Sequence, residues 1–462
     1  MDGREWFDLV LDPGWESLFD DVVGGDPLGF PGYRQALEAA KAKTGEAESM
    51  LVARGSIDGQ PILALSSVFG FLGGSMGAAH GERVCRAFEL ATQHRLPVVA
   101  MTASGGARMQ EGMVALSQMP ATLQARAAHR ACGLKMVAVL RHPTTGGVFA
   151  SYGNAADRLI AIEGATIGFA GPRVAEAFTG QPLPEGSHTA DNALGHGLVH
   201  GVVASPELKA TVAAALHEAT PRPPAAVTPP PQPAAAAATS PPQPAAQASF
   251  HRARWRGAFG RVPKFPDEDA AWAAVQSARD ASRTDRIRAA FPEPGPATIG
   301  GRRCIVVDSP KTPTVEDFRE ARARITQAEH DGLPLVALVD MVGADPSAAS
   351  EASGIAREIS RTMHAAVTAA TPTVALVYGE GGSGGALALC AGADRLGICE
   401  GASFSVIAPE GAAAILRRDD LPAVARDLRC GPSALQALGL ADQVVPDDEA
   451  FEWVSAALGE VC

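Results

Sequence analysis

The stretch TVALVYGEGGSGGALAL, residues 373 to 389, joins an apolar run to a cluster of glycines. Its first six residues are β-branched or apolar and predict a buried strand. Five of the next seven residues are glycine, which is poorly tolerated inside regular elements, so the cluster needs a structural or chemical reason. A phosphate cradle and a flexible hinge are the first two explanations to consider.

The first half of the chain contains a counterpart of this stretch, because short motifs recur at a constant offset of 237 residues, as between Leu96 and Leu333. The matching segments are HRLPVVA (94–100) with DGLPLVA (331–337), DRL (157–159) with DRL (394–396), EGA (163–165) with EGA (400–402), and Pro172 with Pro409. Four matches in one register predict that the fold is duplicated.

A segment rich in proline and alanine separates the two halves. Residues 220–249 read TPRPPAAVTPPPQPAAAAATSPPQPAAQAS, a composition that cannot bury enough apolar surface to fold. We therefore expect a first domain at residues 1–219, an extended linker at 220–249 and a second domain at 250–462.

Each half has the same predicted order of elements. A helix (82–93; 315–330) leads into a buried strand (97–102; 335–340), and a second helix leads into a second buried strand (135–140; 373–378). Strands that alternate with helices predict an α/β protein, with its functional site at the carboxyl ends of the strands.

Charge and cysteine content narrow the functional class. The 462-residue chain has a net charge of −12, which argues against nucleic acid or an anionic membrane as its main partner. The seven cysteines form no CxxC pair or zinc-type cluster, and no signal peptide or uninterrupted run of 18 apolar residues is present. We expect a cytoplasmic enzyme without a bound metal.

Glycine or other small residues follow the predicted strands at equivalent places: SGGARMQE (104–111), TTGG (144–147), MVGA (341–344) and GGSGGA (381–386). No lysine follows these segments as a P-loop requires, and their recurrence at equivalent strand ends disfavours a hinge. Small residues between a strand and a helix leave backbone N–H groups free to stabilise negative charge. Because no paired nucleophile and histidine stand out, chemistry based on backbone amides, such as forming a thioester enolate, fits best.

Most of these motifs closely resemble the β subunit of the bacterial acetyl-CoA carboxylase carboxyltransferase. The segments are DPLGFPGYRQALEAAKAKTGEAE (26–48), FLGGSMGAAHGE (71–82), TASGGARMQEG (102–112), HPTTGGVFAS (142–151) and IGFAGPRV (167–174). AWAAVQSARD (271–280), GEGGSGGALAL (379–389) and FSVIAPEGAAAIL (404–416) are similar to the α subunit of that enzyme. The resemblance implies a duplicated crotonase-like (ClpP/crotonase) ββα superhelix with two homologous domains.

The resemblance also implies a reaction and its partners. Carboxybiotin on a separate biotin carboxyl carrier protein, itself charged by a biotin carboxylase, would give its carboxyl group to the α-carbon of an acyl-CoA. The product would be a malonyl-type CoA, used for fatty acids or as a polyketide precursor. The active site of the family lies between an N-type and a C-type half of a dimer, so a homodimer or larger homo-oligomer is expected. A biotin-independent malonyl-thioester decarboxylase and a degenerate scaffold subunit remain alternatives.

Residue roles follow from the same resemblance. Gly105 and Gly106 would hold the enolate, and Gly385 and Ala386 the ureido oxygen of biotin, with Gly146 and Gly147 as the first-half counterparts of that second pair. Arg108 would contact the substrate or form a structural ion pair. The full set of implied substrate-binding residues is Gly73, Gly74, Ser75, Arg108, Gly146, Gly147, Gly382 and Gly384.

Two departures from the family pattern stand out. The four-cysteine zinc module of the bacterial β subunit is missing, so no metal is predicted. The α subunit's Asp-Thr-Pro-Gly is here Asp340-Met341-Val342-Gly343, which we expect to alter the biotin side of the site.

Overall fold

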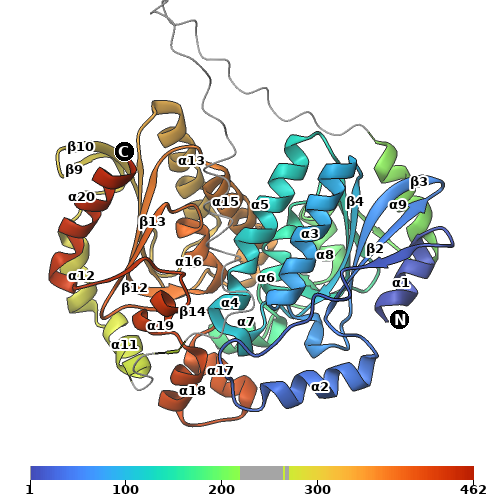
Figure 1. The fold of residues 1–462 in the computed structure, drawn as a ribbon, viewed down its shortest axis with the longest axis horizontal. Coiled ribbons are helices and arrows are strands. Elements are labelled where there is room, and N and C mark those ends of the chain that lie inside the picture. The colour runs from blue at the N-terminus through green and yellow to red at the C-terminus, as the bar shows by residue number, and fades with distance from the viewer. Residues whose placement is uncertain (1, 219–263, 266–269) are drawn as a thin grey trace, which may run out of the picture.

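The computed structural model describes residues 2–218, 264–265 and 270–462, which form two α/β halves lying side by side (Figure 1). The predicted linker at 220–249 and the first residues of the predicted second domain lie outside the described residues.

The first half is built on an eight-stranded sheet with the strand order β1-β2-β3-β4-β5-β6-β8, in which β7 also pairs with β5. The pairs from β3 onward are parallel, whereas β1, β2 and β3 pair antiparallel. The strands are β1 Glu16–Leu18, β2 Met50–Ile57, β3 Gln60–Ser67, β4 Val98–Ser104, β5 Met136–Thr145, β6 Arg158–Ile162, β7 Ile167–Gly168 and β8 Gly201–Val203. The helices are α1 Gly3–Val10, α2 Tyr33–Thr44, α3 Ala78–His94, α4 Gly112–Leu116, α5 Gln118–Ala131, α6 Gly146–Phe149, α7 Pro172–Thr179, α8 Ala190–Gly195 and α9 Leu208–His217, with 3₁₀ turns η1 Leu72–Gly74, η2 Met109–Glu111, η3 Tyr152–Asn154 and η4 Ser205–Glu207.

The second half is built on a seven-stranded sheet with the order β15-β13-β12-β11-β10-β9, in which β14 also pairs with β12. The strands are β9 Gly295–Ile299, β10 Arg302–Val307, β11 Leu335–Met341, β12 Thr373–Gly382, β13 Arg395–Cys399, β14 Ser403–Ser405 and β15 Gln443–Val445. The helices are α11 Ala270–Ala278, α12 Ala281–Ala289, α13 Val315–Asp331, α14 Ala348–Ala352, α15 Ile355–Thr368, α16 Ser383–Cys390, α17 Pro409–Leu416, α18 Leu421–Leu428, α19 Pro432–Ala437 and α20 Ala450–Val461, with the 3₁₀ turn η5 Asp447–Glu449.

The duplication predicted from the sequence is confirmed in the structure. Six elements of the first half, α3, β4, α5, β5, β6 and α7, begin and end 237 residues before α13, β11, α15, β12, β13 and α17. The offset therefore holds for whole helices and strands, and equivalent residues of the two halves can be paired by number.

The strands extend further than predicted. β4 ends at Ser104, β5 at Thr145 and β12 at Gly382, whereas the apolar runs end at residues 102, 140 and 378. Because α6 and α16 begin at the very next residue after β5 and β12, no loop separates strand from helix at these two places. Much of the glycine cluster 379–385 is therefore strand or helix, and the polar strand ends hid this from the apolar pattern.

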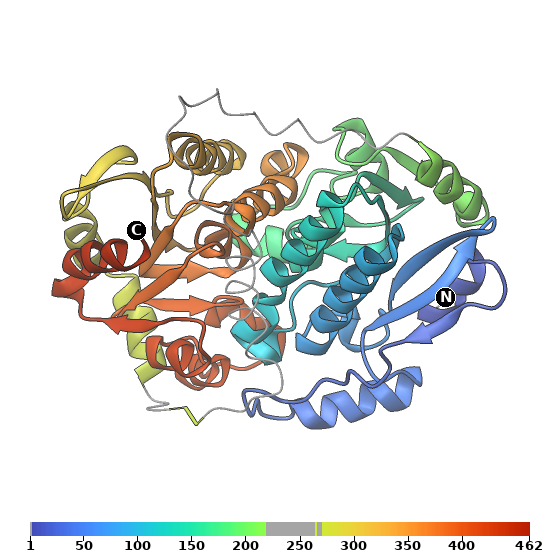
Figure 2. The same cartoon turned by 45° about the horizontal axis from the view of Figure 1, so that its top comes forward.

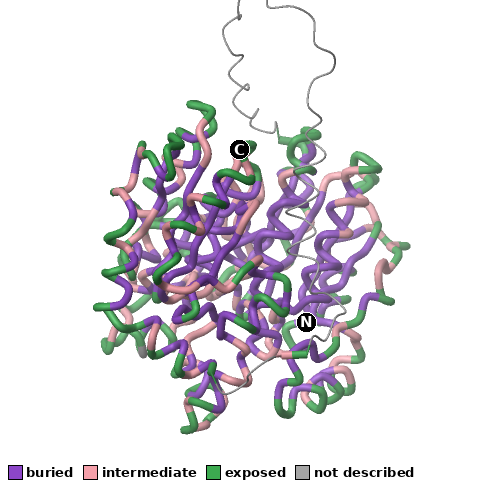
Figure 3. The backbone as a smooth tube through the Cα atoms, turned by 60° about the vertical axis from the view of Figure 1, so that its left-hand side comes forward, coloured by how far each residue is buried: buried purple, intermediate pink, exposed green. Residues whose placement is uncertain are grey.

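The central parallel strands form the core of each half. Strands β4 and β11 are buried along their whole length, as parallel strands covered on both faces are. Figure 3 shows these inner segments buried, with exposed residues mostly on the outer helices and turns.

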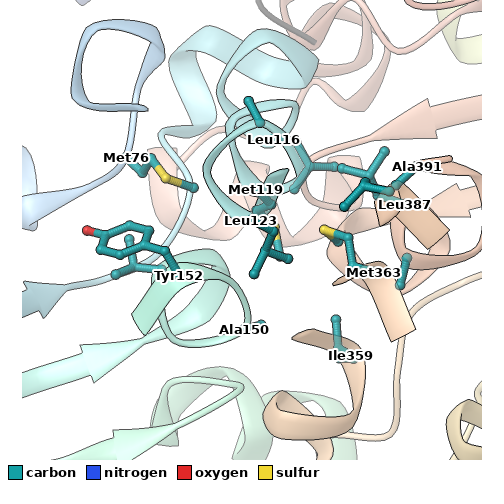
Figure 4. Packing of buried hydrophobic residues seen from close by; sticks show 14 of the residues in the cluster. Met76, Leu116, Met119, Leu123, Ala150, Tyr152, Ile359, Met363, Leu387 and Ala391 are labelled. Carbon is teal, nitrogen blue, oxygen red and sulfur yellow. The ribbon is translucent and has the colours of Figure 1, made fainter. Parts of the chain in front are cut away.

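The two halves pack through equivalent helices, because α5 of the first lies against α15 of the second (Figures 1 and 2). Leu116, Met119 and Leu123 on the first-half side face Met363 and Leu387 on the other, and all five side chains are buried (Figure 4). The described helices include none with the length and apolar character needed to cross a membrane.

Candidate active site

The turn that follows β4 is held by the segment 73–76. The Gly105 amide donates to the carbonyl oxygen of Gly73 at 2.9 Å, and the Met76 amide donates to that of Gly106 at 2.8 Å. The Gly106 amide donates to Oγ of Ser104 at 3.0 Å. The turn is therefore fixed from both sides before any ligand binds.

These bonds differ from the expectation that the amides of Gly105 and Gly106 themselves hold the enolate, because both N–H groups are used inside the protein. The next amide, that of Ala107, has no hydrogen-bond partner among the described residues. The free donor of this turn is thus Ala107, and the two glycines shape the backbone that presents it.

The β5–α6 junction lies directly against this turn. Gly106 has a φ of +114°, and a Cβ atom built on it would lie 3.2 Å from Cα of Gly146 and 3.3 Å from N of Gly147. A Cβ built on Gly147 would lie 3.4 Å from N of Ala107. The Gly147 amide, in the first turn of α6, also has no partner among the described residues. Two free N–H donors on adjacent backbones are the groups from which an oxyanion hole can be built.

The segment 73–75 supports the turn. Gly74 has a φ of +62°, and a Cβ atom there would lie only 2.0 Å from the carbonyl oxygen of Ala103. Oγ of Ser75 accepts from Nε of Arg108 at 3.2 Å, and its carbonyl oxygen accepts from Nη2 at 2.8 Å. Gly73, Gly74 and Ser75, expected to bind substrate, thus contact the protein itself here.

Arg108 belongs to a buried ionic network. Its side chain is fully buried, and its guanidinium donates to Glu48 at 2.5 Å and to Glu111 at 3.1 Å. Burial alone would lower the pKa of Arg108, but the charges of Glu48 and Glu111 outweigh it and raise that pKa well above its usual value. Of the two alternatives left open by the sequence, the contacts that Arg108 makes here are those of the structural ion pair.

The second-half junction, between β12 and α16, lies at the equivalent place. By the 237-residue offset, Gly146 corresponds to Ser383, and both have a positive φ, +63° and +55°. Gly147 corresponds to Gly384. The expected pairing of Gly146 and Gly147 with Gly385 and Ala386 is therefore shifted by two residues, a correction that follows from the equal bounds of the strands.

Helix geometry decides which amides of this junction are free and which are hydrogen-bonded within α16. The N–H groups in the first turn of an α-helix have no acceptor four residues earlier, which leaves Gly384 and Gly385, the second and third residues of α16, as free donors. Ala386 is the fourth helical residue, where the internal hydrogen-bond ladder begins. Gly385 thus keeps its expected donor capacity, whereas the Ala386 amide falls within the ladder.

The Met341-Val342 segment lies directly against the second junction. A Cβ atom built on Gly382 would lie 1.9 Å from the carbonyl oxygen of Val342, and one on Gly385 would lie 2.9 Å from Sδ of Met341. A cavity of about 20 Å³ is lined in part by Gly382 and Val342. The segment that departs from the family pattern therefore borders the site.

One side chain lies between the two junctions. A Cβ atom built on Gly147 would lie 3.2 Å from Sδ of Met119, and one on Gly384 would lie 2.7 Å from its Cε. Met119 is on α5 of the first half, is buried, and points toward the second half in Figure 4. The two junctions of a single chain thus face each other across Met119.

Glu351 also links the halves and was not identified from the sequence. Its carboxylate accepts from the amides of Phe169 at 2.8 Å and Ala170 at 2.7 Å, and the carbonyl oxygen of Phe169 accepts from the Gly146 amide at 2.9 Å. The second half therefore fixes the segment that holds the first-half junction. A glutamate on a short, alanine-rich helix gives no sequence signal of such a role.

Among the described residues, no group of three or more His, Cys, Asp or Glu side chains has the geometry to hold a metal ion. Two duplicated α/β halves of this kind define a crotonase-like protein, with free amides where strand meets helix in its candidate site.

Comparison with known proteins gives the family. Residues 26–247 match the carboxyl transferase domain, and residues 311–452 match the acetyl co-enzyme A carboxylase carboxyltransferase-like family. The acetyl-coenzyme A carboxylase carboxyl transferase subunits beta/alpha of Salinispora tropica are 39% identical, covering 95% of this chain and 81% of that protein. A probable biotin-dependent acyl-coenzyme A carboxylase beta3 subunit of Mycobacterium bovis is 36% identical, covering 97% and 90%. A transcarboxylase 12S crystal structure matches with 21% identity and a TM-score of 0.41, covering 100% of this chain and 89% of that one.

The chain belongs to the acetyl-CoA carboxylase carboxyltransferase family and carries its β-type and α-type halves in one polypeptide. It is a carboxyltransferase with the duplicated crotonase-like fold.

Proposed function

We propose that this protein is the carboxyltransferase component of a biotin-dependent acyl-CoA carboxylase. It moves a carboxyl group from carboxybiotin, carried by a separate protein, to the α-carbon of an acyl-CoA and yields a malonyl-type CoA. The observation that carries the proposal is the pair of junctions with free amides that face each other across Met119.

The first-half amides suit the acyl-CoA. Transfer of the α-proton to the ureido nitrogen that the carboxyl group leaves would place negative charge on the thioester oxygen, and the N–H groups of Ala107 and Gly147 are the two donors available for it. Each such donor is worth about 3–4 kcal/mol of transition-state stabilisation. Because the protein fixes both backbones, little reorganisation is needed when the charge forms.

The second-half amides suit the ureido carbonyl of biotin. Gly384 and Gly385 bear no side chains, so a flat ring can approach their N–H groups closely at the positive end of α16. Carboxybiotin supplies the carboxyl group, and these two amides stabilise the oxygen of the ring it leaves. Met341 and Val342 border this side of the site, so their size affects how closely the biotin ring can approach.

The proposal includes partners of the kind found in this family. A biotin carboxyl carrier protein brings the biotin, a biotin carboxylase loads it, and the chain works as a homo-oligomer in the cytoplasm. Production of malonyl-type building blocks for fatty acids or polyketides is the expected use of the product.

The test is exchange with a carrier. The purified protein is incubated with malonyl-CoA and biotinylated carrier, and carboxylated carrier and acyl-CoA are followed together. Carrier-dependent exchange supports the proposal. Release of CO₂ without the carrier identifies a decarboxylase instead, and no turnover with any acyl-CoA identifies a scaffold subunit.

Two variants test whether the exchange activity depends on the first-half junction. Gly147→Val places a branched side chain against Met119 and the Ala107 amide, and we expect exchange to fall by about 100-fold or more, as for loss of one oxyanion donor. Gly25→Val is the control, because Gly25 is exposed and nothing lies within 4 Å of its added Cβ. Normal exchange by the Gly147 variant would refute the assignment of this junction.

A further inference from the structure

A second cavity, of about 710 Å³, lies between the two halves. Arg126 and Arg130, in the last turns of α5, line it, whereas Met119 at the start of α5 contacts the glycine junctions. At 1.5 Å rise per helical residue, the cavity begins roughly 10–16 Å along α5 from the candidate active site. It is therefore a separate place in the molecule.

The lining of this cavity is strongly basic. Its cationic and imidazole side chains come from both halves: Arg126, Arg130 and His200 from the first, and Arg322, Arg357, Arg361 and His364 from the second. Such a concentration of arginine is unexpected on a chain with a net charge of −12. The local positive charge therefore indicates a site for an anion.

Few carboxylates balance these arginines. Asp157 pairs with Arg126 at 2.7 Å and lies 4.0 Å from Arg130. Glu358 is shared by the second-half arginines: it contacts Arg322, Arg361 at 3.1 Å and Arg357 at 4.0 Å. Arg319, outside the lining, lies 4.0 Å from the same carboxylate. Five lining arginines thus have two carboxylates among the described residues, which leaves about three positive charges uncompensated.

Two polar atoms of the lining residues are buried without a hydrogen-bond partner, Nε of Arg357 and Oδ1 of Asn154. The same arginine donates from Nη1 to the carbonyl oxygen of Gly197 at 3.0 Å, which fixes its guanidinium across the boundary between the halves. The guanidinium of Arg357 is thus held in place before a ligand binds, which lowers the cost of ordering it.

We propose that this arginine cavity binds a small metabolite, distinct from the acyl-CoA substrate, that bears two or more phosphate groups. The guanidinium fork matches phosphate oxygens in a bidentate way, and a polyphosphate supplies several charges within one short molecule. A volume of about 710 Å³ is that of a small-molecule site. The site goes beyond carboxyl transfer and does not depend on it.

Bound there, the ligand bridges the last turns of α5 and one face of α15, the helices through which the halves pack. A ligand that binds only the docked form stabilises it by mass action. Polyphosphate therefore raises the thermal midpoint of unfolding of the full chain.

The test measures binding of inorganic tripolyphosphate to the full-length protein by calorimetry at about 0.15 M salt, where loose surface attraction is screened. Arg130→Gln and Arg361→Gln remove one outer arginine from each half, while the Arg126–Asp157 and Arg322–Glu358 pairs stay in place. We expect each to weaken binding by about tenfold or more, as for a lost charge-assisted contact. Arg303→Gln, an exposed arginine on β10, is the control and leaves the affinity unchanged.

ATP and acetyl-CoA complete the experiment. Tighter binding of ATP than of tripolyphosphate identifies a nucleotide ligand, and equal binding identifies the phosphate chain alone as the recognised group. Displacement of tripolyphosphate by acetyl-CoA would overturn the proposal, because the cavity would then be part of the substrate site. Absence of saturable binding, or equal weakening by the Arg303 control, would also overturn it.

Discussion

The contact between Met119 and Gly384 predicts coupling between the two halves that unfolding experiments can measure. In Gly384→Ala, the new Cβ would lie 2.7 Å from Cε of Met119, with no strain from φ. Overpacking costs about 1–3 kcal/mol, and alanine regains about 1 kcal/mol of helix propensity over glycine. The single substitution should therefore lower the free energy of unfolding by up to about 2 kcal/mol.

Removing the methionine should reverse this effect. Met119→Ala alone costs about 2–5 kcal/mol, because the side chain is buried and leaves a cavity. In the double variant the added methyl group meets that cavity, so the clash is relieved and a favourable coupling of about 1–3 kcal/mol is expected.

Urea unfolding of the four proteins gives the coupling free energy. Gly385→Ala is the matched control, because its Cβ would meet Met341 at 2.9 Å instead, so Met119→Ala should not relieve it. If the Gly384 and Met119 effects add to within about 0.5 kcal/mol, the side chains do not meet and the proposed packing of the halves is wrong.

Three further predictions concern the parts that hold the site. Arg108→Met leaves the buried carboxylate of Glu48 without its partner and should cost about 3–5 kcal/mol of stability, measured by urea unfolding; a loss below about 1 kcal/mol would contradict the buried pair. Glu351→Gln keeps the size of the side chain but loses the charge that accepts from Phe169. It should lower the exchange rate while leaving the thermal midpoint of unfolding nearly unchanged; an unchanged exchange rate would show that Glu351 does not position the site. Burial lowers the pKa of His80 to about 3 and of His129 to about 4, so below the ordinary value of about 6.5 the unfolded chain binds protons that the folded chain does not. Stability should therefore fall as the pH drops from about 6.5 toward 4 and stay level in this respect above it, and an unfolding midpoint that is constant from pH 7 to 5 would contradict this.

The duplication and the glycine junctions of the candidate site could be predicted from the sequence, because both depend on patterns carried by the chain itself. Apolar strands and the repeated Asp-Arg-Leu and Glu-Gly-Ala motifs set the register, and helices and strands then followed it residue for residue. The glycines after these strands marked the junctions because only residues without a side chain allow backbones this close.

Which backbone N–H groups are free to bind a ligand could not be predicted from the sequence. It depends on hydrogen-bond acceptors that are distant in sequence and on the geometry of the folded turn. Gly105 loses its amide to Gly73, 32 residues earlier, and only the folded turn shows this. Arg108 resembles a substrate contact in the motif, yet Glu48 lies 60 residues away and neutralises it inside the core. The glycine motifs predicted where the candidate site lies. Contacts between residues distant in sequence decide which of its backbone amides are free.

The bonds from Phe169 and Ala170 to Glu351 have a consequence for how the protein is made. The ribosome adds Glu351 182 residues after Phe169. At about 5–20 residues per second, the first half waits roughly 10–40 s for this carboxylate. A nascent or truncated chain thus lacks the carboxylate that fixes the segment behind the first-half junction, and synthesis of the second half supplies it.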